Sequence, residues 1–538
     1  MTVLLRRSRD LPQPMEYSGW VAIRAVGAAG LDPARRVRNL GVQLEQAFEA
    51  IAQDWWALAR KIGCETTAWP THAAAAAPNA SDLGLMLAWT QLVDNWSAAA
   101  DIVLVLCDDP WLFRHLASRP NVRAGSVPGL AAPVCLLLLR GFLSRVATAA
   151  RAAHDAIRLR STRRFASRHS PAILVYGHPA SNPEGYDAYF GNLMERIPSL
   201  VRVLHTDCRG SLALTLSAKG RAVSLHAWGN PWAAVSLIAA RWRPSPASRT
   251  GAHGWLVRRA AAIENGHGNI AMTRWQDHCQ RRWLRSQRPR AVAWPWENHP
   301  WERALVRSAV LEDAQTVGYQ HSVIGRHMLN YAAHSNPDGL ASMPQHVLCT
   351  GLTTQRQLAK WGIPASRLAV GGALRFLANP RTRFDPAAAI FVALPFGGTI
   401  AAEMIDAARD LAVAGRTVLV KDHPMTPSTF EEGPNLKRTH RPLTEHECVS
   451  AVVYAATTVG LEARLAGLPT IRFRSSANIA LDILPEGVDV PPTERDTIVA
   501  DVSQLIERGP AAPLARDGIF AAVESALWTQ ILGEREIA

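Results

Sequence analysis

Glu297 and His321 are the residues of this chain whose type and position best suit a general base. Glu297 follows a short apolar run, residues 291–294, that predicts a β-strand, and His321 follows a second such run, residues 316–319. Between the runs, Pro300 suits the first turn of a helix, because its missing N–H and fixed φ cost nothing there. The pattern is one β-α-β unit, so both side chains follow the carboxyl ends of neighbouring parallel strands, where open α/β sheets bind ligands.

A second group of candidate residues follows two predicted strands in the last third of the chain. One strand ends in Lys421 and His423, which place a cation and an imidazole at its exit. The next gives way to Thr457 and Thr458 at the start of a helix, where hydroxyls, backbone N–H groups and the helix dipole favour an anion. Glu462, one turn further, could accept hydroxyls from a ribose or a sugar. Together these residues predict a site for a phosphate group with something attached to it.

Each of these residues also has a simpler interpretation. Glu297 could cap a helix, and His321 could be a satisfied core imidazole. The threonine pair could be a helix cap, and His423 with the following proline could be a turn. The chain contains two other His-Pro pairs, at 178 and 299, so the dipeptide alone is a weak signal.

The elements around these sites alternate between strand and helix, which predicts an α/β fold. We expect an extra, α-rich N-terminal region over residues 1–165, including an amphipathic helix from Val42 to Ile62. Two Rossmann-like domains should follow, an acceptor domain over 166–378 and a donor domain over 379–538. A linker over 379–386 would leave a cleft between them.

Composition limits the class of protein. The chain has 538 residues, a net charge of +13 and 48% hydrophobic residues, which is typical of a globular protein attracted to anions. It has no interleaved basic and aromatic motif, so nucleic acid is not an expected partner. Its seven scattered cysteines and the absence of a signal peptide indicate a reducing, cytoplasmic location. We expect no metal, and the pair Asp108-Asp109 before Pro110 reads as a helix cap.

A long basic helix is predicted between residues 130 and 165. At 3.6 residues per turn one apolar stripe carries Leu139, Phe142, Val146, Ala150 and Ile157, and one flank carries Arg140, Arg151 and Arg158. Residues 140–169 hold eight arginines and one acid, Asp155. Such a helix suits the surface of an anionic inner membrane, although it could also be solvated and packed on the next domain. The apolar run from Val127 to Leu139 is too short to span a bilayer.

Several motifs taken in order resemble a known family. They are ENHPWERAL and GYQHS over 297–322, LxxWGIPxxRLAVGG over 358–372, KDHP at 421–424 and ATTVGLEARLAGLP at 456–469. This series is similar to a bacterial surface-carbohydrate biosynthesis family of capsule and lipopolysaccharide glycosyltransferases. The resemblance covers residues from about 170 onward and implies the GT-B fold, in which two Rossmann-like domains face each other across a cleft.

The resemblance also implies roles for single residues. In related enzymes that use cytidine-activated donors, such as sialyltransferases and Kdo transferases, the histidine of a His-Pro motif contacts the donor phosphate, and here that is His423. A hydroxyl pair before a late helix binds the same phosphate, which assigns Thr457 and Thr458. The sialyltransferase motif of two carboxylates and a glycine is missing before the linker, so Glu297 or His321 would act as the base.

The resemblance implies an inverting, metal-independent transfer without a cofactor. The donor would be a nucleotide sugar, in the first place a CMP-activated ulosonic acid, and the acceptor a glycan or lipid-linked glycan. Gln320, Ser322 and Arg375 are further candidate contacts to substrate in the cleft. The alternatives are a CDP-alditol phosphotransferase and a non-catalytic scaffold of polysaccharide assembly.

Overall fold

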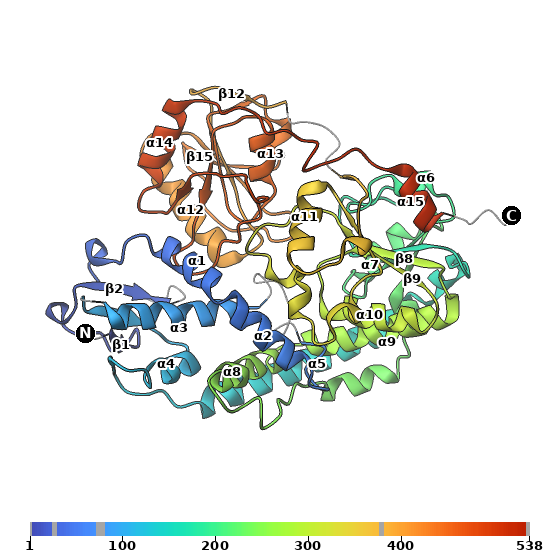
Figure 1. The fold of residues 1–538 in the computed structure, drawn as a ribbon, viewed down its shortest axis with the longest axis horizontal. Helices are drawn as coiled ribbons and strands as arrows, with labels where there is room; N and C mark the ends of the chain where they lie inside the picture. The colour runs from blue at the N-terminus through green and yellow to red at the C-terminus, as the bar shows by residue number, and fades with distance from the viewer. Residues whose placement is uncertain (1–2, 24–29, 72–80, 100, 376–380, 534–538) are drawn as a thin grey trace.

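Three parallel β-sheets follow one another along the chain in the computed structural model, each covered by helices (Figure 1). The structure describes residues 3–23, 30–71, 81–99, 101–375 and 381–533. In Figure 1 the first sheet lies at the lower left, the second at the right and the third at the top. The second and third sheets are the two expected Rossmann-like α/β units, so the predicted fold class is confirmed.

The N-terminal region contains a small parallel sheet as well as the expected helices. Its four strands have the order β2-β3-β1-β4. The bounds are β1 Val3–Arg6, β2 Gly19–Ala22, β3 Val103–Leu106, β4 Val122–Ala124, α1 Leu40–Ala50, α2 Ala52–Gly63, α3 Leu83–Ala98 and α4 Pro110–Leu116. The single helix predicted over 42–62 is thus two helices that meet at Ile51. Asp109 caps α4, because its carboxylate accepts the N–H groups of Trp111 and Leu112, at 3.1 and 3.0 Å.

One long helix, α5 (Ala131–Arg158), leads from this region into the second sheet. The helix predicted between residues 130 and 165 is therefore confirmed over most of its length. Its apolar side chains continue beyond Arg140, where the apolar run in the sequence stops. Among the described residues, α5 is the one helix long and apolar enough to cross a membrane. A short 3-10 segment, η4 (Arg160–Phe165), follows it.

The second sheet has seven parallel strands in the order β11-β10-β9-β8-β5-β6-β7. Its strands are β5 Ala172–Val175, β6 Val201–Leu204, β7 Ala222–Ser224, β8 Ala291–Pro295, β9 Gln315–Gln320, β10 His346–Cys349 and β11 Leu368–Val370. Its helices are α6 Leu193–Arg196, α7 Gly210–Leu216, α8 Gly254–Asn265, α9 Asn269–Gln287, α10 Pro300–Val310 and α11 Leu352–Lys360. The β8-α10-β9 unit and the helix start at Pro300 agree with the sequence prediction.

The third sheet has six parallel strands in the order β15-β14-β13-β17-β18-β19. Its strands are β13 Ile390–Ala393, β14 Val418–Lys421, β15 Leu436–Thr439, β17 Ala451–Tyr454, β18 Thr470–Phe473 and β19 Pro492–Thr493, and its helices are α12 Gly398–Val413, α13 Val459–Leu465 and α14 Ile498–Arg508. Two short strands, β12 (Arg383–Phe384) and β16 (Cys448–Val449), pair beside it. Part of the predicted linker thus forms β12, and residues 379–380 lie outside the described residues.

The last helix, α15 (Ser525–Leu532), returns from the third sheet to the second (Figure 1). Trp528 is fully buried there and its ring packs against Tyr319 of β9, with centroids 5.2 Å apart. Its indole N–H donates to the carbonyl of Gly371 at 2.8 Å. The end of the chain therefore ties the two Rossmann-like units together.

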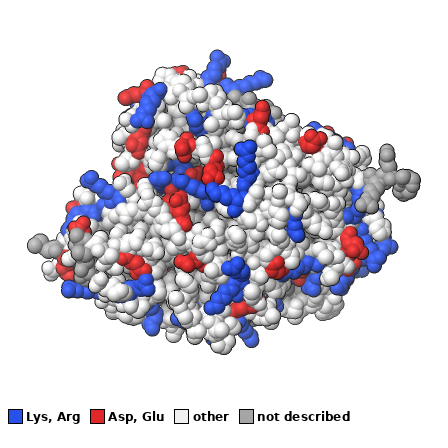
Figure 2. All heavy atoms as spheres, in the orientation of Figure 1, with Lys and Arg blue, Asp and Glu red and all other residues white. Residues whose placement is uncertain are grey.

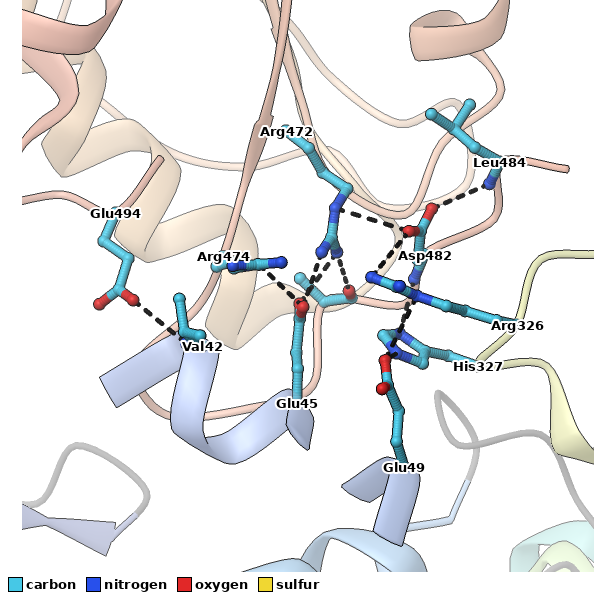
Figure 3. Close-up of polar contacts among 11 residues, drawn as sticks. Val42, Glu45, Glu49, Arg326, His327, Arg472, Arg474, Asp482, Leu484 and Glu494 are labelled. Carbon is cyan, nitrogen blue, oxygen red and sulfur yellow. Dashed lines mark hydrogen bonds and ion pairs between the residues drawn. The ribbon is translucent and has the colours of Figure 1, made fainter. Parts of the chain in front are cut away.

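A buried ion cluster joins α1 to the third sheet (Figure 3). The Glu45 carboxylate accepts two hydrogen bonds from the Arg472 guanidinium, at 2.9 and 2.6 Å, and Arg474 Nε lies 2.9 Å from it. The side chains of Glu45 and Arg472 are only 5% and 3% exposed. Two charges this deeply buried are stable only as a pair, so α1 and β18 are held together.

The same helix also holds the loop after β9. Glu49 of α1 lies 2.8 Å from His327 and 3.3 Å from Arg326, both in that loop (Figure 3). His327 Nδ1 also accepts the backbone N–H of Asp482 at 3.0 Å. Asp482 lies in the segment between β18 and β19 of the third sheet. Because this loop begins at His321, the N-terminal region helps to position a candidate site residue.

Candidate functional site

Both large sheets reverse their strand order at one point, and the candidate residues gather there. In the second sheet β5 lies between β6 and β8, and in the third β13 lies between β14 and β17. Chain connections run in opposite directions from these strands, which leaves room at their carboxyl ends for a ligand. The loops after β5, β8 and β9 and those after β14 and β17 carry the residues described below.

Glu297 sits in a turn whose backbone is held by a second carboxylate, Glu302. Glu302 is 1% exposed and accepts the N–H groups of Glu297 and Asn298 at 3.0 Å each, as well as the Trp294 indole N–H at 3.0 Å. Asn298 has a positive φ of 59°, in the left-handed region that asparagine adopts more readily than most residues. The aim of the Glu297 side chain is therefore fixed by the fold.

The Glu297 carboxylate is paired with His299. Its Oε2 lies 2.8 Å from His299 Nε2, and its side chain remains 37% exposed. Burial alone would raise the pKa of Glu297, but the hydrogen bond to His299 and the charges of His299 and His321 lower it below its usual value. Burial raises the pKa of Glu302 to about 7, and the negative charge of Glu297 adds to this rise. Glu297 is thus the more acidic carboxylate of the two.

His321 follows β9 and packs against Tyr189. The two rings meet edge to face with centroids 5.2 Å apart. Burial lowers the pKa of His321 to about 4, so the imidazole is neutral at neutral pH. Its Nδ1 is buried and has no hydrogen-bond partner within the described part of the chain. The unused nitrogen can form a hydrogen bond with a ligand, whereas a pKa this low disfavours uptake of a proton at neutral pH.

Arg375 links this group to the third sheet. Its guanidinium lies over the Tyr189 ring, 5.7 Å from the centroid. Burial raises the pKa of Glu462, on α13, to about 7, and the charge of Arg375 opposes that rise. The same guanidinium lowers the pKa of His178 after β5, where burial is the larger cause. One cation therefore acts on titratable groups of both sheets. A site shared by the two Rossmann-like domains would require such an arrangement.

His423 and His178 have the same local geometry on opposite sheets. His423 Nδ1 accepts the N–H of Met425 at 3.2 Å, and His178 Nδ1 accepts the N–H of Ala180 at 3.1 Å. In the neutral rings the proton is therefore on Nε2, which can donate it to a ligand. Burial lowers the pKa of His423, and the charges of Lys421 and His178 lower it further. The two imidazoles are thus electrostatic neighbours across the domain boundary.

The remaining candidates for the donor site lie at the carboxyl ends of strands, as the sequence predicts. They are Lys421 in β14 and the pair Thr457 and Thr458 after β17. Lys421 ends β14, with Nζ 3.3 Å from the carbonyl of Asp422, and burial lowers its pKa. The helix after Thr458 has only seven residues, and the hydroxyl of Thr457 is 3.5 Å from the N–H of Val459. The hydrogen bond by which this threonine pair would cap the helix is therefore long. The role of the pair as a phosphate ligand stays a prediction.

Of the predicted substrate contacts, Gln320 is less accessible than Arg375, whereas Ser322 and Arg375 are both partly buried. Gln320 is fully buried at the end of β9. Ser322 is partly buried, and its carbonyl accepts the Thr350 hydroxyl at 3.3 Å. Because the Gln320 side chain is fully buried, a direct contact with substrate would require it to move.

The sequence analysis missed Glu302, His178, His299 and Tyr189. Both histidines belong to the His-Pro pairs whose presence made the His-Pro motif at His423 a weak signal. All three pairs nevertheless follow the carboxyl ends of strands. The recurrence of His-Pro after predicted strands was the available signal. Within the described residues no group of three or more His, Cys, Asp or Glu side chains could hold a metal ion. The expectation of a metal-independent reaction stays a prediction.

No protein-family model matches the sequence, and a search of curated proteins found no match. Among solved structures, the glycotransferase of kitacinnamycin aligns with 11% identity and a TM-score of 0.37, over 68% of this chain and 95% of that one. A UDP-GlcNAc 2-epimerase from Methanocaldococcus jannaschii, in complex with UDP-GlcNAc and UDP, aligns with 10% identity and a TM-score of 0.40, over 66% and 97%. The Neisseria meningitidis UDP-GlcNAc 2-epimerase bound to UDP-GlcNAc gives 11% and 0.36, over 67% and 99%. Likeness of this degree carries no argument about function, which rests on the chain's own residues.

Proposed function

We propose that the chain is a glycosyltransferase that moves a sugar from a nucleotide donor to a hydroxyl group of a growing surface glycan. The observation that carries this proposal is the polar group shared by the two sheets. A carboxylate and a neutral imidazole, Glu297 and His321, lie on the second sheet, and two imidazoles with Nε2 protons, His178 and His423, belong to opposite sheets. This is the set of groups that displacement at a sugar phosphate requires.

In this mechanism the base and the phosphate ligands have separate roles. Glu297 removes the proton from the acceptor hydroxyl as it attacks the sugar carbon, which requires hydrogen-bond contact with that hydroxyl. His321 is the alternative base. The phosphate that leaves with the nucleotide gains negative charge, which Lys421, His178 and His423 stabilise by charge and hydrogen bonds. Thr457 and Thr458 add hydroxyl donors beside the same phosphate.

The nucleotide is the part of the donor that a simple experiment can identify. Thermal-shift measurements with CMP, CDP, UDP and GDP should show stabilisation by one base class, because a ligand that binds only the folded state stabilises it by mass action. We propose a cytidine nucleotide, in keeping with the His-Pro resemblance. Stabilisation by UDP alone would replace CMP-sugars with UDP-sugars as donors, and no stabilisation by any nucleotide would favour the scaffold alternative. A phosphodiester product would identify a phosphotransferase.

His423→Ala should weaken binding of that nucleotide about ten-fold, the cost of one hydrogen bond to a charged phosphate. Isothermal titration calorimetry measures the change. His440→Ala, at an exposed histidine of the same domain, is the matched control and should bind as the wild type does. Unchanged affinity in His423→Ala would remove this residue from the donor site.

Glu462 should make donor binding depend on pH near neutrality. Burial raises its pKa to about 7, so the side chain is neutral below that pH and a carboxylate above it. Hydrogen bonds from ribose or sugar hydroxyls are stronger to the carboxylate, so affinity should rise about five-fold between pH 6 and pH 8. The comparison with Glu462→Gln over the same range cancels the titration of the nucleotide itself. Equal pH dependence in the two proteins would place Glu462 outside the donor site.

A further inference from the structure

Helix α5 exposes a row of large apolar side chains. We define the apolar ridge as Leu136, Leu139, Phe142, Leu143 and Val146, whose exposed fractions are 67%, 59%, 47%, 59% and 37%. These residues recur at three- and four-residue spacing, so they form one continuous stripe. A contiguous apolar surface of this kind on a folded protein marks a site of interaction with another apolar phase.

The opposite face of α5 fixes the direction in which the ridge points. Arg145 is 3% exposed and donates to the carbonyls of Ile238 and Asn265 at 3.0 and 2.9 Å. Gly141 packs so closely on the same neighbour that a Cβ added to it would lie 1.7 Å from the Asn265 oxygen. The helix cannot roll to bury its ridge without breaking these contacts.

The flank of the ridge is basic. At 3.6 residues per turn Arg140, Arg151 and Arg158 lie about 100–120° from Leu139, all on the same side. Residues 111–183 contain eleven arginines and one acid, Asp155, which is buried. Long arginine side chains beside an apolar stripe can reach the phosphates of a lipid surface while the stripe enters the acyl region.

A second pair of exposed apolar side chains belongs to a segment that packs on α5. The 3-10 helix η6 (Ala233–Ala239) packs beside α5 through the bond from Arg145 to Ile238. Trp232, just before it, is 84% exposed, and Val235 is 61% exposed. Tryptophan prefers the boundary between the headgroups and the acyl chains of a bilayer. Two elements in contact with each other thus each expose large apolar side chains.

An arginine-lined pocket of about 360 Å³ lies between η6 and α9. Arg274 and Arg281 line it together with Trp69 and His278. Its one acid, Asp277, is paired with Arg281 at 2.7 Å. Arg274 Nε has no hydrogen-bond partner among the described residues, which leaves it available to an anionic headgroup.

We propose that the apolar ridge of α5, with Trp232 and Val235, docks this protein on the surface of a bilayer that contains anionic phospholipid. The ridge enters the headgroup and acyl boundary, and Arg151 and Arg158 bind lipid phosphates, since Arg140 already donates to the carbonyl of Gly266 at 2.9 Å. The helix lies along the surface and does not cross it, because crossing would strip Arg145 and Asp155 of their protein surroundings. A second copy of the chain is a poorer partner, since α5 offers no exposed acid to the arginines of its copy. The proposal is independent of the reaction that the enzyme carries out.

Flotation of the full-length protein with lipid vesicles tests the proposal. The wild type should bind vesicles of phosphatidylcholine with a third of phosphatidylglycerol at low salt, and bind more weakly at high salt or on phosphatidylcholine alone. Leu139→Ser/Phe142→Ser should lower the partition coefficient at least about ten-fold, because two side chains no longer enter the acyl boundary. Arg151→Gln/Arg158→Gln should lower it about five-fold for each arginine and reduce the salt dependence.

Matched controls separate docking from general stickiness and from misfolding. Leu311→Ser and Val413→Ser remove apolar side chains that are 81% and 89% exposed outside α5, and should bind as the wild type does. The ridge residues are exposed, so their variants should keep the wild-type melting temperature. No binding of the wild type at low salt, or equal binding of the ridge variant, overturns the proposal. A wild-type dimer that does not bind vesicles and that the ridge substitutions dissociate would assign the ridge to self-association instead.

Discussion

Glu297→Gln is expected to lower the rate of sugar transfer by about 10²- to 10⁴-fold, the usual contribution of a positioned general base. The substituted amide keeps the shape of the side chain but cannot accept the acceptor's proton. The turn should persist, because Glu302 holds the backbone N–H groups of residues 297 and 298 independently of the Glu297 side chain. Transfer is measured as nucleotide release that depends on acceptor, with the donor class taken from the thermal-shift screen.

The pH profile adds a second test of the same assignment. Although burial opposes it, the hydrogen bond to His299 and the charges of His299 and His321 lower the pKa of Glu297. A base must be deprotonated, so the transfer rate at saturating donor, to which the pH dependence of donor binding does not contribute, should fall only when the pH drops below the usual pKa of glutamate. A fall in the transfer rate as the pH drops through 7 would instead point to Glu302 or Glu462, whose pKa values are both about 7.

The controls for Glu297 distinguish a lost base from a damaged fold. Glu195→Gln, at an exposed carboxylate on α6 of the same domain, should retain full activity. Donor binding by Glu297→Gln should be unchanged, since the nucleotide contacts are assigned to His178 and to residues of the third sheet, not to Glu297. Full activity in Glu297→Gln together with loss in His321→Asn would move the base to His321. Full activity in both would refute the catalytic assignment.

Glu45→Ala is expected to destabilise the protein by about 3–5 kcal/mol, the cost of leaving a buried charge without its partner. Arg472 is 3% exposed and loses both of its short hydrogen bonds, and Arg474 loses the same carboxylate (Figure 3). Asp482 lies 3.9 Å from Arg472 and keeps a weaker ion pair with it, so the loss should fall toward the lower end of this range. The measurement is the denaturant midpoint, followed by circular dichroism.

Asp406→Ala is the matched control for this effect. Asp406 also bonds two arginines, Arg409 and Arg495, but its side chain is 39% exposed. Figure 2 shows that charged side chains are scattered over the face in view, and exposed pairs of this kind contribute about 0–1 kcal/mol each. The double variant Glu45→Ala/Arg472→Met should recover part of the loss, because no buried charge is left without a partner. Equal effects of Glu45→Ala and Asp406→Ala would show that the buried pair contributes no more than an exposed one.

Local patterns in the sequence were sufficient to predict the strands that precede the candidate site residues and the places of those residues at the strand ends. The strands before Glu297, His321, Lys421 and Thr457 are short apolar runs that end in polar residues, and the structure has strands at these places. The stripe on α5 was equally readable, because helical periodicity depends only on residues within a few turns. Parallel sheets place the carboxyl ends of their strands along one edge, so the order of motifs already predicted which residues share an edge.

Contacts between distant segments were decided by tertiary structure alone. The electrostatic effect of His178 on His423 and the bond between Glu45 and Arg472 depend on packing and leave no periodic signal. The same holds for α15, which extends the third unit back onto the second. Whether the α5 stripe faces a protein core or solvent was also undecidable from periodicity, because both arrangements have the same spacing. Only the burial of Gly141 and Arg145 on the opposite face shows that the stripe points outward.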